Sequence, residues 1–254
     1  MSKIIFITGA TTGFGKAIAE TFAAAGWHCI ITGRRKDKLI EVAKALAEKY
    51  PIEILPICFD VSDRVATENA INSLPEAWKN ISILVNNAGL AIGRDSFENA
   101  FLDDWDQMID TNLKGLVYVS KFILPLFIKN KKGHIINIGS TAAKAVYKDG
   151  NMYCATKHAV DAITKAQRID LLQYGIKVTA IHPGAVAGTE FSLVRYKGDD
   201  AKAEQVYKGY QPLVAADVAD AVFYCANLPA HVCINDLVIT CTAQADNIYF
   251  HKEL

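Results

Sequence analysis

The sequence predicts an α/β fold with a doubly wound parallel sheet of about seven strands and helices on both faces. Short apolar runs rich in Ile, Val, Leu and Phe alternate with helical patterns along the whole chain. Strands that are apolar throughout are typical of a parallel sheet buried on both sides. A length of 254 residues, with no linker, repeat or low-complexity tract, favours a single domain over residues 1–254.

The expected elements follow the order that right-handed βαβ units require. The predicted strands are residues 3–8, 27–32, 53–59, 81–86, 134–139, 177–181 and 237–240. The predicted helices are residues 14–25, 36–49, 64–73, 103–129, 152–173 and 215–227. Gly26 and Gly175 stand where helix-terminating glycines are expected. The polar segment 188–210 is predicted to be a mobile, partly helical flap.

The balance of charge and the cysteines limit the partners and the compartment. Lys+Arg and Asp+Glu number 27 each, so no net field attracts nucleic acid or an anionic membrane. No apolar run reaches the roughly 18 residues of a membrane helix, and the first strand begins too early for a secretory signal before it. None of the six cysteines forms a C-x-x-C pair, so we expect no metal site and a reducing cytoplasm.

A glycine-rich loop at residues 8–15 reads Thr-Gly-Ala-Thr-Thr-Gly-Phe-Gly and joins the first strand to the first helix. This is the context of a Rossmann-type dinucleotide site. Gly9 permits a tight turn, Gly13 lets the backbone approach the pyrophosphate, and Gly15 allows close helix–strand packing. A plain glycine-rich turn is the alternative. The predicted cofactor contacts in this loop are Gly9, Thr11, Thr12, Gly13, Phe14 and Gly15.

The end of the second strand indicates which dinucleotide binds. Sites for NAD place an acid there to hold the ribose 2′-hydroxyl, but this chain has Arg34 and Arg35. Both can pair with a 2′-phosphate, so we expect NADP(H) as the cofactor. A solvated basic turn is the alternative. Asp60 ends the third strand and is predicted to accept from the adenine amino group, unless it is an ordinary turn aspartate.

Tyr153 and Lys157 lie four residues apart on a predicted helix, and Ser140 closes a strand shortly before them. An i, i+4 pair shares one helix face. The ammonium of Lys157 is therefore expected to lower the pKa of the Tyr153 phenol, which would make it a proton donor and acceptor near neutral pH. A chance pairing is the alternative, but no other tyrosine of the chain has a lysine four positions on.

Asparagines mark two further positions. Asn87, Ala88 and Gly89 follow the fourth strand, where small residues let a cofactor lie against the sheet edge. Asn112 lies inside the long predicted helix, although asparagine is a poor helix former. It needs a reason, such as a local kink or a bound water, unless it simply faces solvent.

Together these motifs resemble those of the short-chain dehydrogenase/reductase family, and the resemblance covers the whole chain. It implies that Tyr153 is the general acid/base, that Ser140 polarises the substrate oxygen, and that Lys157 holds the nicotinamide ribose. It also implies that Asn112 holds a water that connects Lys157 to solvent. The remaining cofactor contacts that we predict are Val61, Pro183, Gly184, Val186 and Thr189. Family members pair the helices 103–129 and 152–173 across a twofold axis, which implies a homotetramer.

A closer resemblance, over residues 188–192, 194–199 and 228–232, is to the NADP-dependent 3-hydroxy acid dehydrogenase branch of that family. In that branch Arg195 would receive a substrate carboxylate, whereas the alternative is a surface arginine. The chain departs from the branch at residues 143–146, which read Ala-Lys-Ala-Val. Lys144 is therefore a second candidate anion contact or a solvated side chain.

The resemblance implies an NADP-dependent oxidoreductase that transfers a hydride between nicotinamide and a small 3-hydroxy acid or its 3-oxo partner. A carbonyl reductase for apolar ketones or 3-oxoacyl thioesters is the alternative enzyme. A non-catalytic NADPH sensor is the alternative from another class, and it would not need Ser140, Tyr153, Lys157 and Asn112 together.

Overall fold

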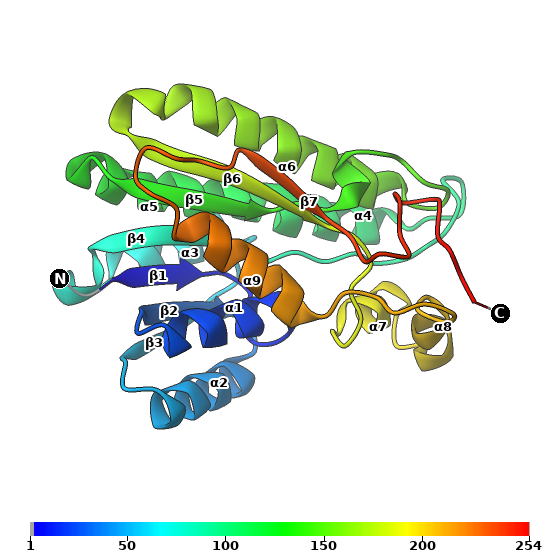
Figure 1. Cartoon of the computed structure of the whole chain (residues 1–254), viewed down its shortest axis with the longest axis horizontal. Coiled ribbons are helices and arrows are strands. Elements are labelled where there is room, and N and C mark those ends of the chain that lie inside the picture. Colours follow the sequence, from blue (N-terminus) through cyan, green and yellow to red (C-terminus); the bar gives the residue numbers. More distant parts are fainter. Residues whose placement is uncertain (1–2, 254) are drawn as a thin grey trace.

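The computed structural model describes residues 3–253 and confirms the predicted alternation of strands and helices (Figure 1). Seven parallel strands form one sheet in the order β3-β2-β1-β4-β5-β6-β7. The strands are β1 (Ile4–Ile7), β2 (His28–Gly33), β3 (Ile54–Cys58), β4 (Ile81–Asn86), β5 (Gly133–Ile138), β6 (Ile176–Pro183) and β7 (Asp236–Ile239). Each lies within a few residues of the predicted strand.

The order of the strands reverses beside β1, which pairs with β2 on one side and with β4 on the other. The loops that leave the carboxyl ends of β1 and β4 therefore start side by side and then lead in opposite directions along the sheet. A crevice opens at such a switch point, and it is where ligands bind in open α/β sheets. The glycine loop and the Asn87 segment follow these two strands, so the topology brings them together.

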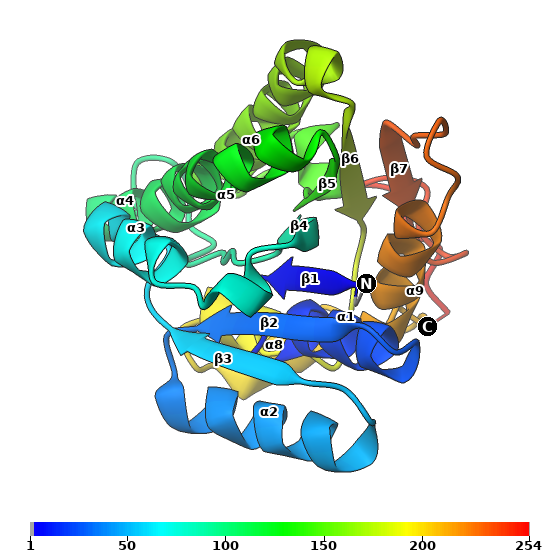
Figure 2. The ribbon, with the colours of Figure 1, turned by 90° about the vertical axis from the view of Figure 1, so that its left-hand side faces the viewer.

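Helices cover both faces of the sheet, as predicted (Figure 2). On one face α1, α2 and α9 enclose a core that includes Ile5, Ile7 and Phe22. On the other face α3 and α5 enclose a second core that includes Phe6, Ile123 and Phe127. The helix bounds are α1 (Gly13–Ala24), α2 (Lys36–Lys49), α3 (Arg64–Asn72), α4 (Leu102–Ile109), α5 (Leu116–Asn130), α6 (Asn151–Asp170), α7 (Phe191–Arg195), α8 (Asp200–Gln205) and α9 (Ala215–Ala226).

The two edge strands differ from the expectation that strands are buried on both faces. The residues of β3 and β7 are half-buried or exposed, whereas β1 and β5 are buried throughout. Pro56 lies in β3, and a proline, which lacks an N–H, is tolerated in an edge strand. The apolar runs alone did not distinguish edge strands from central ones.

The long predicted helix 103–129 is not regular. A π-helical turn, Asp110–Gly115, separates α4 from α5. The continuous helical run Leu102–Asn130 is long and apolar enough to meet a length-and-composition test for a membrane span, which the sequence had not led us to expect. Its α5 part packs against the sheet through Val119, Ile123 and Phe127, so it serves as a core helix here.

Segment 188–210 lies beyond the carboxyl ends of the strands (Figure 1). It is partly helical, as predicted, because it contains the short helices α7 and α8. Gly175 was predicted to terminate the helix that carries Tyr153. That helix, α6, ends at Asp170, and a 3-10 turn (Leu172–Tyr174) then leads to Gly175 at φ 66°.

Candidate active site

The glycine loop packs directly on the segment that follows β4. Gly9 adopts φ 67°, and a Cβ there would lie 2.9 Å from the Cα of Ala88. A Cβ on Gly15 would clash with the carbonyl oxygen of Gly9 and with the Asn87 amide. Gly15 therefore permits close packing below the loop, as the sequence predicted, and does not itself line the cavity.

Asn87 ties the two loops together. Its side-chain Nδ2 donates to the carbonyl oxygens of Thr8 (2.8 Å) and Gly9 (3.1 Å). In return, the Thr8 hydroxyl accepts from the backbone N–H groups of Asn87 and Ala88, each at 2.9 Å. These bonds fix the crevice at the switch point before any ligand enters.

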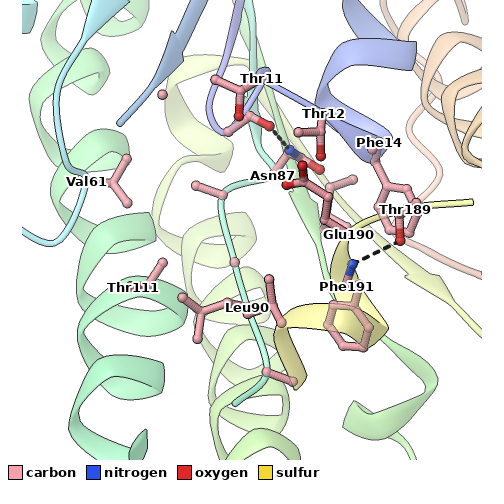
Figure 3. Close-up of a pocket in the computed structure, with 18 of the residues that line it drawn as sticks. Thr11, Thr12, Phe14, Val61, Asn87, Leu90, Thr111, Thr189, Glu190 and Phe191 are labelled. Carbon is pink, nitrogen blue, oxygen red and sulfur yellow. Dashed lines mark hydrogen bonds between the residues drawn. The ribbon is translucent and has the colours of Figure 1, made fainter. Parts of the chain in front are cut away.

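A cavity of about 330 Å³ runs along this crevice (Figure 3). Its walls come from the loops after the strands and from the flap, which contributes Thr189, Glu190 and Phe191 opposite Asn87 and Leu90. The predicted cofactor residues that line it are Gly9, Thr11, Thr12, Gly13, Phe14, Arg34, Arg35, Val61, Asn87, Ala88, Gly89, Tyr153, Lys157 and Thr189. Lining residues that the sequence did not indicate are Gly33, Phe59, Leu90, Ala91, Thr111, Ile138, Gly139, Glu190, Phe191 and Val194.

One end of this cavity is basic. Arg35 donates to the Glu190 carboxylate (2.6 Å) and to the Thr11 hydroxyl (2.9 Å). Lys38 also donates to Glu190, at 2.9 Å. The Glu190 carboxylate thus links the flap to Arg35 and Lys38. Two positive charges share this one carboxylate, so this end of the cavity could accept a further anion.

Asp60 does not line the cavity, contrary to the prediction. Its carboxylate accepts from Arg34 at 3.2 Å and from the N–H and hydroxyl of Ser62 at 2.9 and 2.7 Å. The neighbouring Phe59 and Val61 line the cavity instead.

Tyr153 and Lys157 lie at the other end, on the buried face of α6. The Lys157 ammonium donates to the carbonyl oxygen of Ile138 (3.0 Å) and lies 5.9 Å from the centre of the Tyr153 ring. Ser140 follows β5 and lines an adjoining cavity that also reaches Tyr153. The structure therefore gathers Ser140, Tyr153 and Lys157 around one end of the crevice, as their spacing predicted.

Burial dominates the ionisation of this group. It raises the pKa of Tyr153 above its usual value, with a further rise from Tyr147, against which hydrogen bonding to Ser140 and the charge of Arg195 act. Burial also lowers the pKa of Lys157 to about 8. The expectation that Lys157 lowers the tyrosine pKa is not met in the protein alone, because desolvation outweighs nearby charge. Tyr153 is a phenol at neutral pH.

Asn112 has the structural reason that its helix position demanded. It lies in the π-helical turn, is 2% exposed, and exchanges two 2.8 Å hydrogen bonds with the backbone of Leu90. Its Nδ2 also donates to the Thr156 hydroxyl at 3.1 Å. Gly89 separates Asn112 from Lys157. A Cβ on Gly89 would lie 3.2 Å from Asn112 Oδ1 and 3.6 Å from Lys157 Nζ. A local kink was one of the alternatives that the sequence left open, and the partner Leu90 was not predicted.

Arg195 is the buried charged residue among those that line the adjoining cavity, whose volume is about 460 Å³. The side chain comes from α7, is 9% exposed, and has no hydrogen-bond partner for Nε or Nη2 among residues 3–253. Its guanidinium stacks on the rings of Tyr147 (5.3 Å) and Tyr153 (5.5 Å). The predicted residues Ser140, Pro183, Gly184, Val186 and Thr189 line this cavity as well.

Lys144 is not brought to either cavity, although the sequence suggested it as a second anion contact. Its ammonium pairs with Asp161 at 3.1 Å and with Asp236 at 2.7 Å. The pairing partners come from α6 and β7, far along the chain, so the local sequence around Lys144 carried no sign of them.

The fold and this site are those of a class of dinucleotide-binding proteins in which the crevice at the switch point ends at a Ser-Tyr-Lys group. The family model described as short chain dehydrogenase matches residues 3–198, and the chain belongs to this family.

Individual relatives are similar along nearly the whole chain. The chain is 48% identical over 234 residues to the NADP-dependent 3-hydroxy acid dehydrogenase YdfG of Escherichia coli strain K12, covering 92% of this chain and 93% of that protein. It is 45% identical to sulfoacetaldehyde reductase 2 of Chromohalobacter salexigens, with 96% of each chain covered. It resembles the closed form of a serine dehydrogenase complexed with NADP+ at a TM-score of 0.92 and 45% identity, covering 98% of this chain and 100% of that one.

Proposed function

We propose that this protein is an NADP-dependent oxidoreductase that transfers a hydride between nicotinamide and a small 3-hydroxy acid or its 3-oxo partner. The observation that carries the substrate class is the buried guanidinium of Arg195, which has unpaired N–H groups and lies beside Tyr153. A buried cation without a partner is costly, so a site that keeps one is suited to bind an anion.

The geometry suits a carboxylate a short distance from the reacting carbon. Arg195 and Ser140 line the same cavity, and Tyr153 connects it with the crevice that holds the glycine loop. A carboxylate on Arg195 would therefore hold the other end of a small substrate near the Tyr153 hydroxyl. Relatives named for 3-hydroxy acids and serine, at 48% and 45% identity, support this class.

The crevice fits a phosphorylated dinucleotide. Gly9 packs closely on Ala88 and exposes its backbone to the cavity beside the first helix. Arg34 and Arg35 also line the cavity and would face the adenine ribose. Glycine backbone and a helix N-terminus suit a pyrophosphate, and guanidinium groups suit a 2′-phosphate. When bound, NADP(H) supplies or accepts the hydride.

The side chains of this protein handle the proton and the orientation. The phenol of Tyr153 donates a proton to the substrate oxygen during reduction and recovers it during oxidation. Ser140 holds that oxygen through its hydroxyl. Lys157, fixed on Ile138, would hold the nicotinamide ribose, and Asn112 holds the Leu90 loop beside it and would hold a water toward Lys157.

A screen of NADPH oxidation tests the proposal against its rivals. The panel contains a small 3-oxo acid, sulfoacetaldehyde, a plain ketone of similar size and a 3-oxoacyl thioester. We expect the 3-oxo acid to have the highest kcat/KM. Preference for sulfoacetaldehyde would keep the anion site but change its ligand, and preference for the ketone or thioester would replace the proposal with a carbonyl reductase. Tight NADPH binding without any turnover would favour the sensor.

We further propose a cytoplasmic homotetramer in which α5 and α6 pair across a twofold axis. Val117 and Ala155 lie exposed on these two helices, whereas Ile123 and Phe127 face the core. All six cysteines are free, which suits a reducing compartment. Light scattering measures the assembly, and an Ala155→Glu variant should dissociate it.

We also propose that the chain acts as one domain whose segment 188–210 opens to admit ligands. Hydrogen exchange of this segment should slow when NADPH is added.

A further inference from the structure

His182 lies at the end of β6, directly before Pro183, and its side chain is fully buried. Its Nδ1 lies 3.3 Å from the backbone nitrogen of Ser140 and 3.1 Å from the backbone oxygen of the same residue. The imidazole also packs on Gly139, where any Cβ would clash with the ring. His182 therefore contacts the backbone that carries Ser140 without lining either cavity.

The other ring nitrogen of His182 faces two carboxylates. Nε2 lies 3.2 Å from Asp236 and 3.4 Å from Asp161, without the angle of a hydrogen bond. The Lys144 ammonium bridges the same two carboxylates, and Lys165 pairs with the second oxygen of Asp161 at 2.6 Å. The three groups Asp161, His182 and Asp236 resemble a cation site, but Lys144 already supplies the positive charge there.

This environment decides where the imidazole proton lies. Two carboxylates beside Nε2 favour a proton on that nitrogen, which leaves Nδ1 to accept from the Ser140 N–H. Burial, followed by the charge of Lys144, lowers the pKa of His182 against the opposing effect of Asp236, the Ser140 backbone and Asp161. The ring is therefore neutral near pH 7.

We infer that His182 is a positioning residue, whose neutral imidazole accepts from the Ser140 backbone and packs on Gly139 so that the Ser140 hydroxyl is held beside Tyr153. A second proton, on Nδ1, would remove this acceptor and turn the ring into a donor toward the Ser140 carbonyl oxygen. Burial favours the neutral ring, and Lys144 adds to this effect by balancing the charge of the two carboxylates. The inference rests on the proposed hydride transfer, because it concerns the efficiency of that step.

The first experiment changes the charge beside His182 without changing the ring. In Lys144→Met the two carboxylates lose their cation while the burial of the ring is unchanged, so the pKa of His182 should rise above that in the wild type. Between about pH 8 and about pH 5.5, we expect the decrease in kcat to be about tenfold larger in Lys144→Met than in the wild type. Lys165→Met removes a positive charge from the same Asp161 but does not face His182, and its profile should match that of the wild type. Matching profiles for Lys144→Met and the wild type would overturn the inference.

The second experiment changes the ring. His182→Leu should lower kcat by about 10- to 100-fold, as expected for a misplaced group, with little change in KM or in NADPH affinity. His182→Asn, which retains an acceptor, should recover part of that loss. Equal kcat in the wild type and a folded His182→Leu variant would contradict the role.

An NMR titration separates failure of this inference from failure of the proposed function. The His182 ring signals should be those of a neutral imidazole at pH 7 in the wild type, and the ring should take up its second proton at a higher pH in Lys144→Met than in the wild type. If the wild type has no turnover, the proposed function fails, and the titration still decides whether Lys144 favours the neutral ring. A wild-type ring that is protonated at pH 7 would overturn the inference even with full activity.

Discussion

The guanidinium of Arg195 lies 5.5 Å from the ring of Tyr153 and has buried N–H groups without partners among the described residues. A buried cation thus lies beside a buried phenol, and the two side chains come from different elements, α7 and α6. Because α7 belongs to the segment beyond the sheet, movement of that segment would deliver and remove the cation. In the proposed function, binding of an anionic substrate and completion of the site would therefore be coupled through Arg195.

Arg195→Ala should discriminate between acidic and neutral substrates. Loss of a charged hydrogen bond costs about 1.5–3 kcal/mol, so KM for a 3-hydroxy acid should rise about 10- to 150-fold. KM for a neutral alcohol of similar size should scarcely change. Steady-state kinetics with both substrates provide the measurement. Lys202→Ala, on the exposed helix α8 of the same segment, is the matched control and should leave both constants unaltered.

Lys144→Ala tests the second anion contact that the sequence suggested. Since Lys144 pairs with Asp161 and Asp236, this change should not discriminate between acid and alcohol. If Lys144→Ala discriminates between acid and alcohol and Arg195→Ala does not, then Lys144 and not Arg195 binds the substrate carboxylate.

Tyr153→Phe should remove the proton donor but keep the ring. We expect kcat to fall by about 10²–10⁴-fold, the usual contribution of general acid/base catalysis. NADPH affinity should be retained, because the ring still fills its place beside Phe191. Fluorescence titration of NADPH serves as the control. Turnover within tenfold of the wild type would mean that another group moves the proton.

The sequence predicted the parts of this site that depend on local spacing. The loop at residues 8–15 and the Tyr153–Lys157 pair needed only strand–turn–helix patterns and the i, i+4 rule. The parallel, doubly wound sheet was predicted because buried apolar strands alternate with helices, whereas the order of the strands came from the structure. The sequence also suggested a kink at Asn112 as one of several alternatives, because an asparagine within an apolar helix is unfavourable.

The long-range electrostatics could not be predicted in the same way. The partners of Lys144 lie 17 and 92 residues away, and Glu190 lies 155 residues from Arg35. The raised pKa of Tyr153 depends on burial, which outweighs the opposing effects of Ser140 and Arg195. Such contacts arise from tertiary packing, and a single sequence contains no periodicity that reveals them.

Glu190→Gln should strengthen the binding of NADPH. The Glu190 carboxylate pairs with Arg35 and Lys38 in a half-exposed position, so a 2′-phosphate must share these cations with it. Exposed ion pairs contribute about 0.2–1 kcal/mol, which corresponds to a gain of up to about fivefold in affinity. NADH affinity should not change. Glu41→Gln, on the exposed side of α2, is the control.

Weaker binding of both cofactors to Glu190→Gln would contradict this competition. It would mean that the Glu190–Arg35 pair mainly holds segment 188–210 over the crevice. Isothermal titration at two salt concentrations distinguishes these results, because only competition for the phosphate predicts a gain confined to NADPH.

Lys157→Met should abolish turnover and weaken NADPH binding, yet stabilise the protein without cofactor. Burial lowers the pKa of Lys157 to about 8 from its ordinary value of 10.5. The folded pKa is thus below the unfolded one, and the unfolded state binds more protons between pH 8 and pH 10.5. The contribution of Lys157 to stability therefore rises with pH across this window, and below pH 8 the full cost of burying the ammonium remains.

That cost is about 3 kcal/mol as an upper figure, so Lys157→Met should exceed the wild type in unfolding free energy by up to that amount at pH 7. The difference should shrink as the pH rises from about 8 to about 10, and other titrating groups cancel because both proteins share them. Urea unfolding at four pH values measures it. Lys121→Met, at an exposed position of α5, should give a flat difference. A flat difference for Lys157→Met as well would show that the buried lysine keeps its ordinary pKa.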